Sequence, residues 1–188
     1  GSGSFITANS YADLAKMSTL IVIGRVIKTE NIINMARDPS DPTKPDNQVF
    51  IVGQVYQVQI KQFLKGNEGD VLYIVQREGF IGPSMSKTEA DIESAKNNED
   101  YIPLSLDKDY LLFLEPMLGF PDGEYYVGVA QPWRFELNDT NLVLPESPWD
   151  EAIRIFPAQS LELVTQQIEH PELLLTTPYP GPTAPPYP

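Results

Sequence analysis

The sequence predicts a mainly-β fold: a small closed barrel with a short helix at each end. Two long apolar segments, residues 18–30 and 48–64, are rich in the β-branched and aromatic side chains that favour strands. Lys65-Gly66 then turns the chain into a third such segment, residues 71–76. No motif typical of a catalytic site accompanies these strands, so we expect a binding scaffold and not an enzyme.

The first element expected is a short amphipathic helix from Tyr11 to Met17. Asn9 or Ser10 can cap its first turn, because either side chain accepts hydrogen bonds from the exposed amides. Tyr11, Leu14 and Ala15 give the helix an apolar face. A helix of this length is not stable alone, so it must pack on the barrel.

The first long strand is expected to be covered on both faces for part of its length. One face is formed by Leu20, Val22, Gly24 and Val26. The other residues do not alternate strictly with these, and they include Thr19, Ile21, Ile23 and Ile27. An apolar run on both faces indicates burial on both sides. The glycine in mid-strand, Gly24, predicts a bend or bulge of the kind that closes a barrel.

The second long strand has one better core face, formed by Phe50, Val52, Tyr56, Val58 and Ile60. Its three glutamines, Gln54, Gln57 and Gln59, are expected outward or at an edge. Gly53 is the matching candidate for a bend. Gly66 is expected to supply the positive φ of the turn that follows.

Two long irregular regions interrupt the strands. Residues 36–47 contain three prolines, which predict a surface loop without regular strand, long enough to bind a partner. Residues 78–106 are mostly polar, with one or two helical turns expected at residues 88–95.

The C-terminal half predicts four more strands and a helix. The strands are expected at residues 110–114, 124–129, 133–137 and 141–144, with a Pro121-Asp122-Gly123 turn before the second and a hairpin joining the last two. A helix is expected to start at Pro157, to bury Leu161, Val164 and Ile168, and to end at His170-Pro171. Four aromatic residues on the neighbouring strands are expected to pair across the sheet: Tyr125, Tyr126, Trp133 and Phe135.

This order of elements resembles the OB-type barrel of the tissue inhibitors of metalloproteinases and the related netrin-type modules. The resemblance rests on residues 20–26, 56–66 and 109–114 and spans roughly residues 9 to 145. It implies an OB-like barrel of five or six strands with short N-terminal and C-terminal helices. That inhibitor family acts through an N-terminal cysteine that chelates the protease zinc, and this chain has no cysteine. No inhibitory residue carries over, and the chain looks more like cysteine-free barrel domains of exported bacterial proteins and lipoproteins.

Three segments are expected along the chain. Residues 1–4, Gly-Ser-Gly-Ser, resemble a cloning remnant, residues 5–175 form a single OB-like barrel domain, and residues 176–188 form a proline-rich tail of polyproline II composition. A native leader or a lipid anchor is compatible with a replaced N-terminus, so we expect an extracytoplasmic protein, secreted or on the cell surface. No stretch reaches the roughly 18 apolar residues of a membrane helix.

Charge excludes several partners. The chain has 26 acidic and 13 basic residues, a formal net charge of -13. Phosphate backbones and anionic membranes bind Lys/Arg clusters, so nucleic acid is not expected as a partner. We expect a protein partner or self-association, and no cofactor.

Few residues are candidates for a site. Asp38, Asp41 and Asp46 share one loop and carry calcium-type oxygen ligands, but their spacing matches no EF-hand and no bidentate glutamate follows, so we expect a solvated turn without a tight metal site. Glu89, Asp91, Glu93, Glu99 and Asp100 form a second acidic set, expected to be a solvated surface. His170 is the only histidine and is expected to sit at a helix C-terminus.

Aromatic residues outside the strands are the candidate contact residues. Trp149 follows Pro148 in an irregular segment and is expected either to plug the barrel end or to meet a partner. Tyr179 and Tyr187 lie in the proline-rich tail and are expected to bind an apolar surface.

The function expected from the sequence is a non-enzymatic binding or assembly module that acts through the two long loops and the tail. A protease-inhibitor-like domain and a self-assembling subunit of a surface fibre are the two alternatives.

Overall fold

The computed structural model describes residues 6–172, of which 44% are in strands and 18% in helices. The helices are α1 (Tyr11–Met17), α2 (Glu89–Lys96), α3 (Asp150–Ile153) and α4 (Leu161–Glu169). The strands are β1 (Leu20–Asn34), β2 (Arg37–Asp38), β3 (Asp41–Pro45), β4 (Phe50–Lys65), β5 (Val71–Ile81), β6 (Asp109–Pro116), β7 (Tyr126–Gly128), β8 (Arg134–Leu137), β9 (Leu142–Glu146) and β10 (Gln159–Ser160). The fold is therefore mainly β, as predicted.

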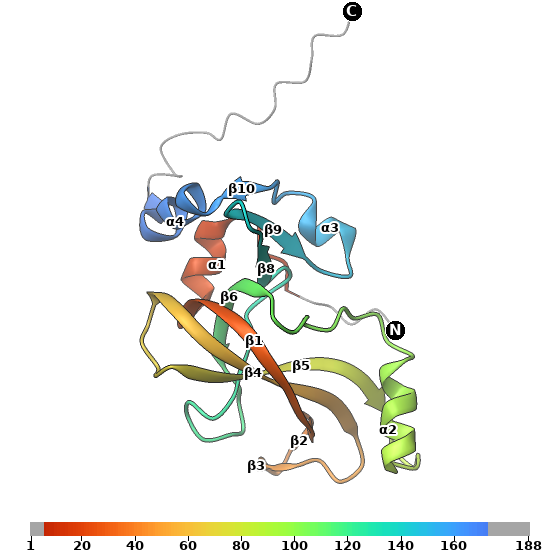
Figure 1. Ribbon diagram of the computed structural model, residues 1–188. Helices are drawn as coiled ribbons and strands as arrows, with labels where there is room; N and C mark the ends of the chain where they lie inside the picture. Colours follow the sequence, from red (N-terminus) through yellow and green to blue (C-terminus); the bar gives the residue numbers. More distant parts are fainter. Residues whose placement is uncertain (1–5, 173–188) are drawn as a thin grey trace, which may run out of the picture.

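Five strands form a ring within one sheet (Figure 1). The strand order is β1-β4-β5-β7-β6, and β6 pairs with β1 to complete the ring. All neighbours are antiparallel except β5 and β7, which are parallel through Ile74 and Tyr126. The sheet continues past the ring because β8 pairs with the first half of β6, at the edge where β7 pairs with the second half.

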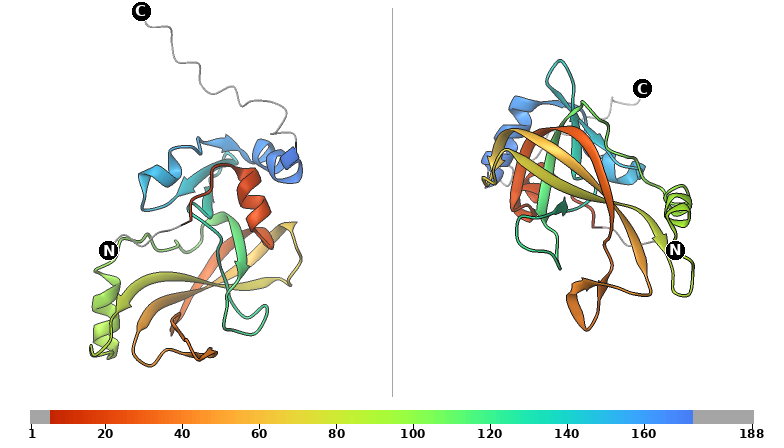
Figure 2. Two further views of the ribbon diagram at one scale, coloured as in Figure 1. Left: turned by 180° about the vertical axis from the view of Figure 1, so that it is seen from behind. Right: turned by 60° about the horizontal axis from the view of Figure 1, so that its bottom comes forward.

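The first strand of the ring is buried on both faces, as the sequence predicts. Leu20, Val22 and Val26 belong to an apolar cluster inside the ring, with Tyr56, Ile74 and Leu112 among its members. Ile21 and Ile23 belong to a second cluster, with side chains from α1 and α4. Figure 2 shows these two helices on the same side of the ring. The short helix α1 is therefore stabilised by packing, and Ser10 caps it as expected.

The glycines of the long strands lie at irregularities of the sheet. The β1–β4 register shifts at Gly24 and the β4–β5 register shifts at Gly53, which confirms both expected bends. Gly66 has φ +77, which confirms a left-handed residue after β4. The connection to β5 is longer than a tight turn, since it spans residues 66–70 and has a second left-handed glycine, Gly69.

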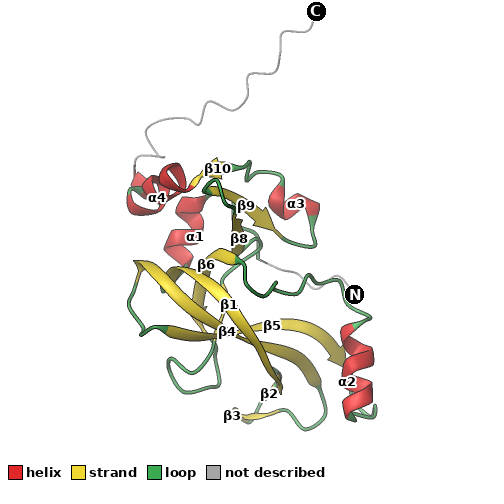
Figure 3. Cartoon of the chain, in the orientation of Figure 1, coloured by secondary structure: helices red, strands yellow, loops and turns green. Residues whose placement is uncertain are grey.

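The expectation of a loop without strand at residues 36–47 is wrong. β2 and β3 form a two-stranded hairpin there, and Pro45 is the partner of Arg37. Prolines are tolerated in this hairpin because both of its strands are edge strands. The cartoon in Figure 3 shows it as a projection separate from the main sheet.

The second long region is also more regular than expected. β5 continues to Ile81, so residues 78–81 are strand, and α2 extends over Glu89–Lys96 with a complete capping box. The capping box supplies the side-chain partners that a short helix needs at its first turn. This region therefore places a helix beside the end of a long strand (Figure 3).

Further differences occur near α3 and α4 and on β4. α4 begins after its cap Ser160 and not at Pro157, because Gln159 and Ser160 pair with β9 as β10. α3 forms where an irregular segment is expected, and its N-cap is Trp149. Gln54 is 4% exposed, so the expectation of an outward or edge side chain is wrong. Its amide donates to the Glu30 carbonyl oxygen, which compensates for burial.

In the described part of the chain, no helix has the length and apolarity needed to cross a membrane. The predicted tail, residues 176–188, lies outside the described residues.

Candidate functional site

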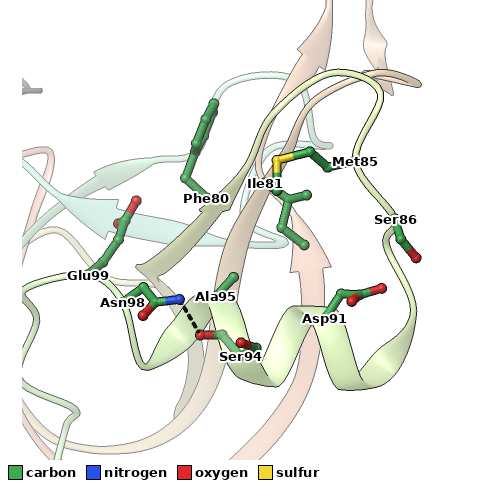
Figure 4. A pocket seen from close by; sticks show the side chains of 9 residues that line it. All are labelled: Phe80, Ile81, Met85, Ser86, Asp91, Ser94, Ala95, Asn98 and Glu99. Atoms are coloured by element: carbon green, nitrogen blue, oxygen red, sulfur yellow. Dashed lines mark hydrogen bonds between the residues drawn. The ribbon is translucent and has the colours of Figure 1, made fainter.

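A groove runs between the end of β5 and α2. It has a volume of about 470 Å³. The residues that line it are Phe80, Ile81, Met85, Ser86, Asp91, Ser94, Ala95, Asn98 and Glu99. Figure 4 shows the strand and the following loop along one side of this β5–α2 groove, and the helix along the other. A concave site with apolar walls and a few polar groups is the usual form of a binding site.

Two apolar side chains of the groove are exposed to solvent. Phe80 is 46% exposed and Met85 is 62% exposed, although both are large enough to be expected in a core. Both reach the same part of the lining: a Cβ added to Gly82 would lie 3.7 Å from Phe80 Cε1 and 3.9 Å from Met85 Sδ. Exposed apolar side chains grouped at a groove indicate a contact surface more than scattered ones do.

α2, which forms one wall of the groove, approaches β5 closely because residue 79 of β5 is a glycine. A Cβ added to Gly79 would lie 3.0 Å from the carbonyl carbon of Ala95 in α2. Ala95 and Ile92 of α2 pack with Val52 and Ile81 of the sheet. The absence of a side chain at Gly79 therefore sets the distance between the two walls.

The carboxylates at the rim of the groove already have partners. Asp91 accepts hydrogen bonds from the backbone amide and hydroxyl of Thr88, and hydrogen bonds from the Ser86 and Thr88 side chains lower its pKa. Glu99 pairs with Arg77 through both carboxylate oxygens, at 2.8 and 3.2 Å. The guanidinium of Arg77 also lies 5.7 Å from the Phe80 ring centroid, a cation–π distance.

A buried polar cluster lies beneath the region that carries α2. Tyr56 of β4 donates its hydroxyl hydrogen to Glu78 of β5, and the Gln76 amide donates to the same carboxylate oxygen at 3.2 Å. Glu78 is 1% exposed. Burial raises the pKa of its carboxyl group, against the opposing effect of the Tyr56 hydrogen bond and of Lys96. The same burial raises the pKa of Tyr56.

Arg134 of β8 extends this cluster to the segment after α2. Its side chain is 2% exposed, and it donates hydrogen bonds to the Gln76 side chain and to the Ile102 carbonyl oxygen. Its Nη2 also lies 2.7 Å from Glu146 Oε1, an ion-pair contact without hydrogen-bond geometry. Burial lowers the pKa of Arg134, which the charge of Glu146 opposes.

The C-terminal end of α2 is tied to the sheet as well. Lys96 donates to Gln54 Oε1 at 3.1 Å, and Gln54 in turn donates to the backbone of β1. Arg134 and Lys96 therefore hold the segment from α2 to Ile102 against the ring. The buried Arg134 links β5, the segment after α2 and β9 through Gln76, Ile102 and Glu146.

The predicted acidic loop does not gather its carboxylates. Asp38 accepts from the amide and hydroxyl of Ser40, and Asp41 accepts from those of Thr43 and pairs with Lys44 at 3.1 Å. Asp46 accepts from the amides of Gln48 and Val49. Each carboxylate therefore stabilises a local turn by accepting hydrogen bonds from residues two or three positions further along the chain. Within residues 6–172 no group of three or more His, Asp or Glu side chains is placed to hold a metal ion.

The β2–β3 hairpin instead contacts the loop between β6 and β7. The Arg37 guanidinium lies 3.9 Å from the centroid of Phe120, which belongs to the loop between β6 and β7. Leu118 in that loop is 88% exposed. A single exposed apolar side chain is common on protein surfaces and does not by itself indicate a binding site.

The predicted aromatic residues have several positions. Trp149 is half-buried, and its backbone amide donates to Ser147 Oγ at 3.3 Å. The four strand aromatics enter three different apolar clusters instead of one set: Trp133 and Tyr126 inside the ring, Phe135 under α1, and Tyr125 with Phe120. Tyr179 and Tyr187 lie outside the described residues. His170 is the C-cap of α4, as predicted.

A second groove of about 540 Å³ lies along α4. Its lining is mostly polar and includes Gln62, Asn141, Thr165 and Gln166, with Glu162 and Glu169 adding charge. It has no exposed aromatic side chain in its lining, unlike the β5–α2 groove.

Comparisons with known proteins give no relative: no family model, no curated protein and no solved structure matches this chain.

Phe80 and Met85 lie within residues 78–106, a region expected to contact a partner, but neither residue was predicted individually from the sequence. Residues 78–106 were expected to be irregular and polar, so neither side chain was assigned to an element. One signal was present: two further apolar residues, Phe80 and Ile81, follow the interruption at residues 76–79, and β5 extends to them.

Proposed function

We propose that this chain is a non-enzymatic binding or assembly module built on an OB-like barrel. Two observations support the barrel: the five-stranded ring with its single parallel pair, β5–β7, and a helix inserted between β5 and β6. OB folds are five-stranded, partly open barrels that bind ligands through loops and one sheet face. Amide hydrogen exchange tests this assignment, since a closed ring protects the amides at both the β1–β6 and the β5–β7 junctions.

The β5–α2 groove is the proposed binding surface. The observation that carries this proposal is the exposure of Phe80 and Met85 in the lining of the groove. Contacts beneath α2 hold the groove in one shape. Gly79 sets the spacing of the walls, and Arg134 and Lys96 anchor the segment that carries α2. A preorganised apolar groove loses little entropy when a ligand binds.

The proposed ligand is an extended protein segment with an apolar or aromatic anchor. The groove is partly open to solvent, and its polar lining includes three uncharged residues, Ser86, Ser94 and Asn98, which suits a peptide main chain. An aromatic anchor would contact Met85, whose thioether adapts to ring surfaces.

A selection experiment tests this function and requires no known ligand. A library of random displayed peptides is selected against the sparsely immobilised full chain, and the affinity of each selected peptide is then measured. We expect the double variant Phe80→Ser/Met85→Ser to weaken their binding at least about tenfold, the loss of about 1.4 kcal/mol. Leu118→Ser is the matched control, because it removes an exposed apolar side chain outside the groove.

Peptides that bind the groove variant as tightly as the wild type would contradict the proposal. Near-ultraviolet circular dichroism of each variant checks that it is folded. The expected extracytoplasmic location is a separate prediction, which the native N-terminal sequence tests, and the groove proposal does not depend on it.

A further inference from the structure

We propose that the β5–α2 groove receives the C-terminal segment, residues 173–188, of a second copy of this chain. The inference rests on the proposed function of the groove and names its ligand. Two properties of the molecule lead to it: the chemistry of the groove with its rim, and the composition of the chain beyond the last described residue.

The composition of the segment suits the apolar walls. Residues 173–188 read Leu-Leu-Leu-Thr-Thr-Pro-Tyr-Pro-Gly-Pro-Thr-Ala-Pro-Pro-Tyr-Pro, with two tyrosines as anchors and six prolines. Proline-rich segments are recognised by grooves with aromatic walls, because their preformed extended backbone loses little entropy on binding. Phe80 and Met85 are the exposed apolar side chains that such a segment would contact.

The charges at the rim favour this segment over a basic ligand. A Lys/Arg-rich peptide gains most from carboxylates without partners, whereas Asp91 is held by Thr88 and Glu99 is paired with Arg77. The segment 173–188 has no charged side chain. It therefore neither breaks these pairs nor buries a charge of its own at the rim.

The position of the groove favours binding between copies. α4, which the segment follows, and α2, which forms the groove, lie at opposite ends of the molecule in Figure 1, and both views of Figure 2 agree. A contact between the segment of one copy and the groove of the next joins two different surfaces. Such a heterologous contact repeats from copy to copy and produces chains or rings.

A complementation experiment with full chains tests this inference. The groove variant is Phe80→Ser/Met85→Ser, and the tail variant is Tyr179→Ser/Tyr187→Ser. Sedimentation velocity is measured for the wild type, for each variant and for their equimolar mixture. We expect the wild type to form species larger than dimers as its concentration rises, and each variant alone to associate at least about tenfold more weakly.

The mixture has a distinctive expected result. The tail variant keeps an intact groove and the groove variant keeps an intact tail, so one pair forms and nothing can be added to it. We therefore expect dimers without larger species. Leu118→Ser serves as the control and should assemble like the wild type.

Ionic strength supplies a second readout. Each copy has a formal charge of -13, so copies repel one another at low salt. Salt screens this repulsion, and we expect wild-type assembly to strengthen between about 0.05 and 0.5 M salt. Assembly that weakens with salt would indicate attraction between opposite charges and would overturn the inference.

Two other results would also overturn it: a wild-type chain that stays monomeric at all concentrations, which includes the case of a segment docked on its own groove, or a tail variant that assembles like the wild type. The proposed function fails separately. If selected peptides bind the groove while the copies do not assemble, only the identity of the ligand is wrong.

Discussion

Glu78 is an unusual residue for a domain of this size, because it is an ionisable side chain with 1% exposure. Its carboxylate accepts from Tyr56 and Gln76, while Lys96 and Arg134 lie close enough to oppose the rise of its pKa. Burial is the larger effect, so the pKa of Glu78 is above the ordinary value of 4.5. A raised carboxyl pKa stabilises the folded protein below pH 4.5, and this stabilisation is lost as the pH rises through the folded-state pKa.

Glu78→Gln is expected to become more stable relative to the wild type as the pH rises above 4.5. The variant keeps a hydrogen-bond acceptor for Tyr56 but has no charge to bury. The difference in free energy of unfolding should grow by at most about 1.4 kcal/mol per pH unit and then level off above the folded-state pKa. Urea denaturation from pH 4 to 8 measures it. Glu89→Gln on the exposed side of α2 is the control, and a flat difference for Glu78→Gln would contradict the assignment.

Alanine substitutions at Gly66 and Gly69 distinguish two effects, backbone strain at positive φ and steric clash of the added Cβ. Both have φ near +76, so alanine strains the backbone equally at each. A Cβ at Gly66 would also lie 2.8 Å from Leu20 Cδ1 and 3.0 Å from the Thr19 carbonyl oxygen, whereas a Cβ at Gly69 meets nothing within 4 Å. We expect Gly69→Ala to cost about 1 kcal/mol and Gly66→Ala clearly more, by chemical denaturation. Equal costs would show that Leu20 does not pack on this turn.

At the scale of elements, α2 is the part of the molecule that the proposed binding surface depends on. It is short and its apolar contacts with the sheet are few, so its position relies on Gly79 and on the ties made by Lys96 and Arg134. Segments with few apolar contacts open more easily than the core.

Gly79→Ala is expected to displace α2, whereas Gly82→Ala is not. A Cβ at Gly79 meets backbone atoms of Ala95 at 3.0 and 3.1 Å, and backbone cannot rotate away. The nearest atom to a Cβ at Gly82 is 3.7 Å away, an ordinary contact. Hydrogen exchange should therefore become faster in residues 89–96 of Gly79→Ala alone. Unchanged hydrogen exchange in residues 89–96 would mean that α2 does not pack closely against Gly79.

At the scale of the whole molecule, sequence patterns predicted the features that depend on residues close together in the sequence, namely strands and their bends. Apolar runs rich in strand-favouring side chains indicated β1, β4 and β6, and the sheet bends occur at Gly24 and Gly53 as expected. Gln54 was misplaced because a glutamine in a strand is usually exposed, and its partners, the Glu30 carbonyl and Lys96, are distant in sequence. Residues 78–106 were expected to contact a partner, but the groove itself was not expected, for the same physical reason: Phe80 lines a groove only because Gly79 lets α2 approach β5.

The central proposal is that Phe80 and Met85 form the surface that receives residues 173–188 of another copy, and methyl NMR of methionine tests it most directly. The chain has four methionines, and Met85 is the one exposed to 62%, while Met117 is buried and Met17 and Met35 are half-buried. Full chain labelled at the methionine methyl carbons is examined at increasing concentration, with Met85→Leu used for assignment. We predict that the Met85 signal shifts or broadens first, and that it stays unchanged in the Tyr179→Ser/Tyr187→Ser variant. A Met85 signal that does not respond while the protein associates would contradict the claim.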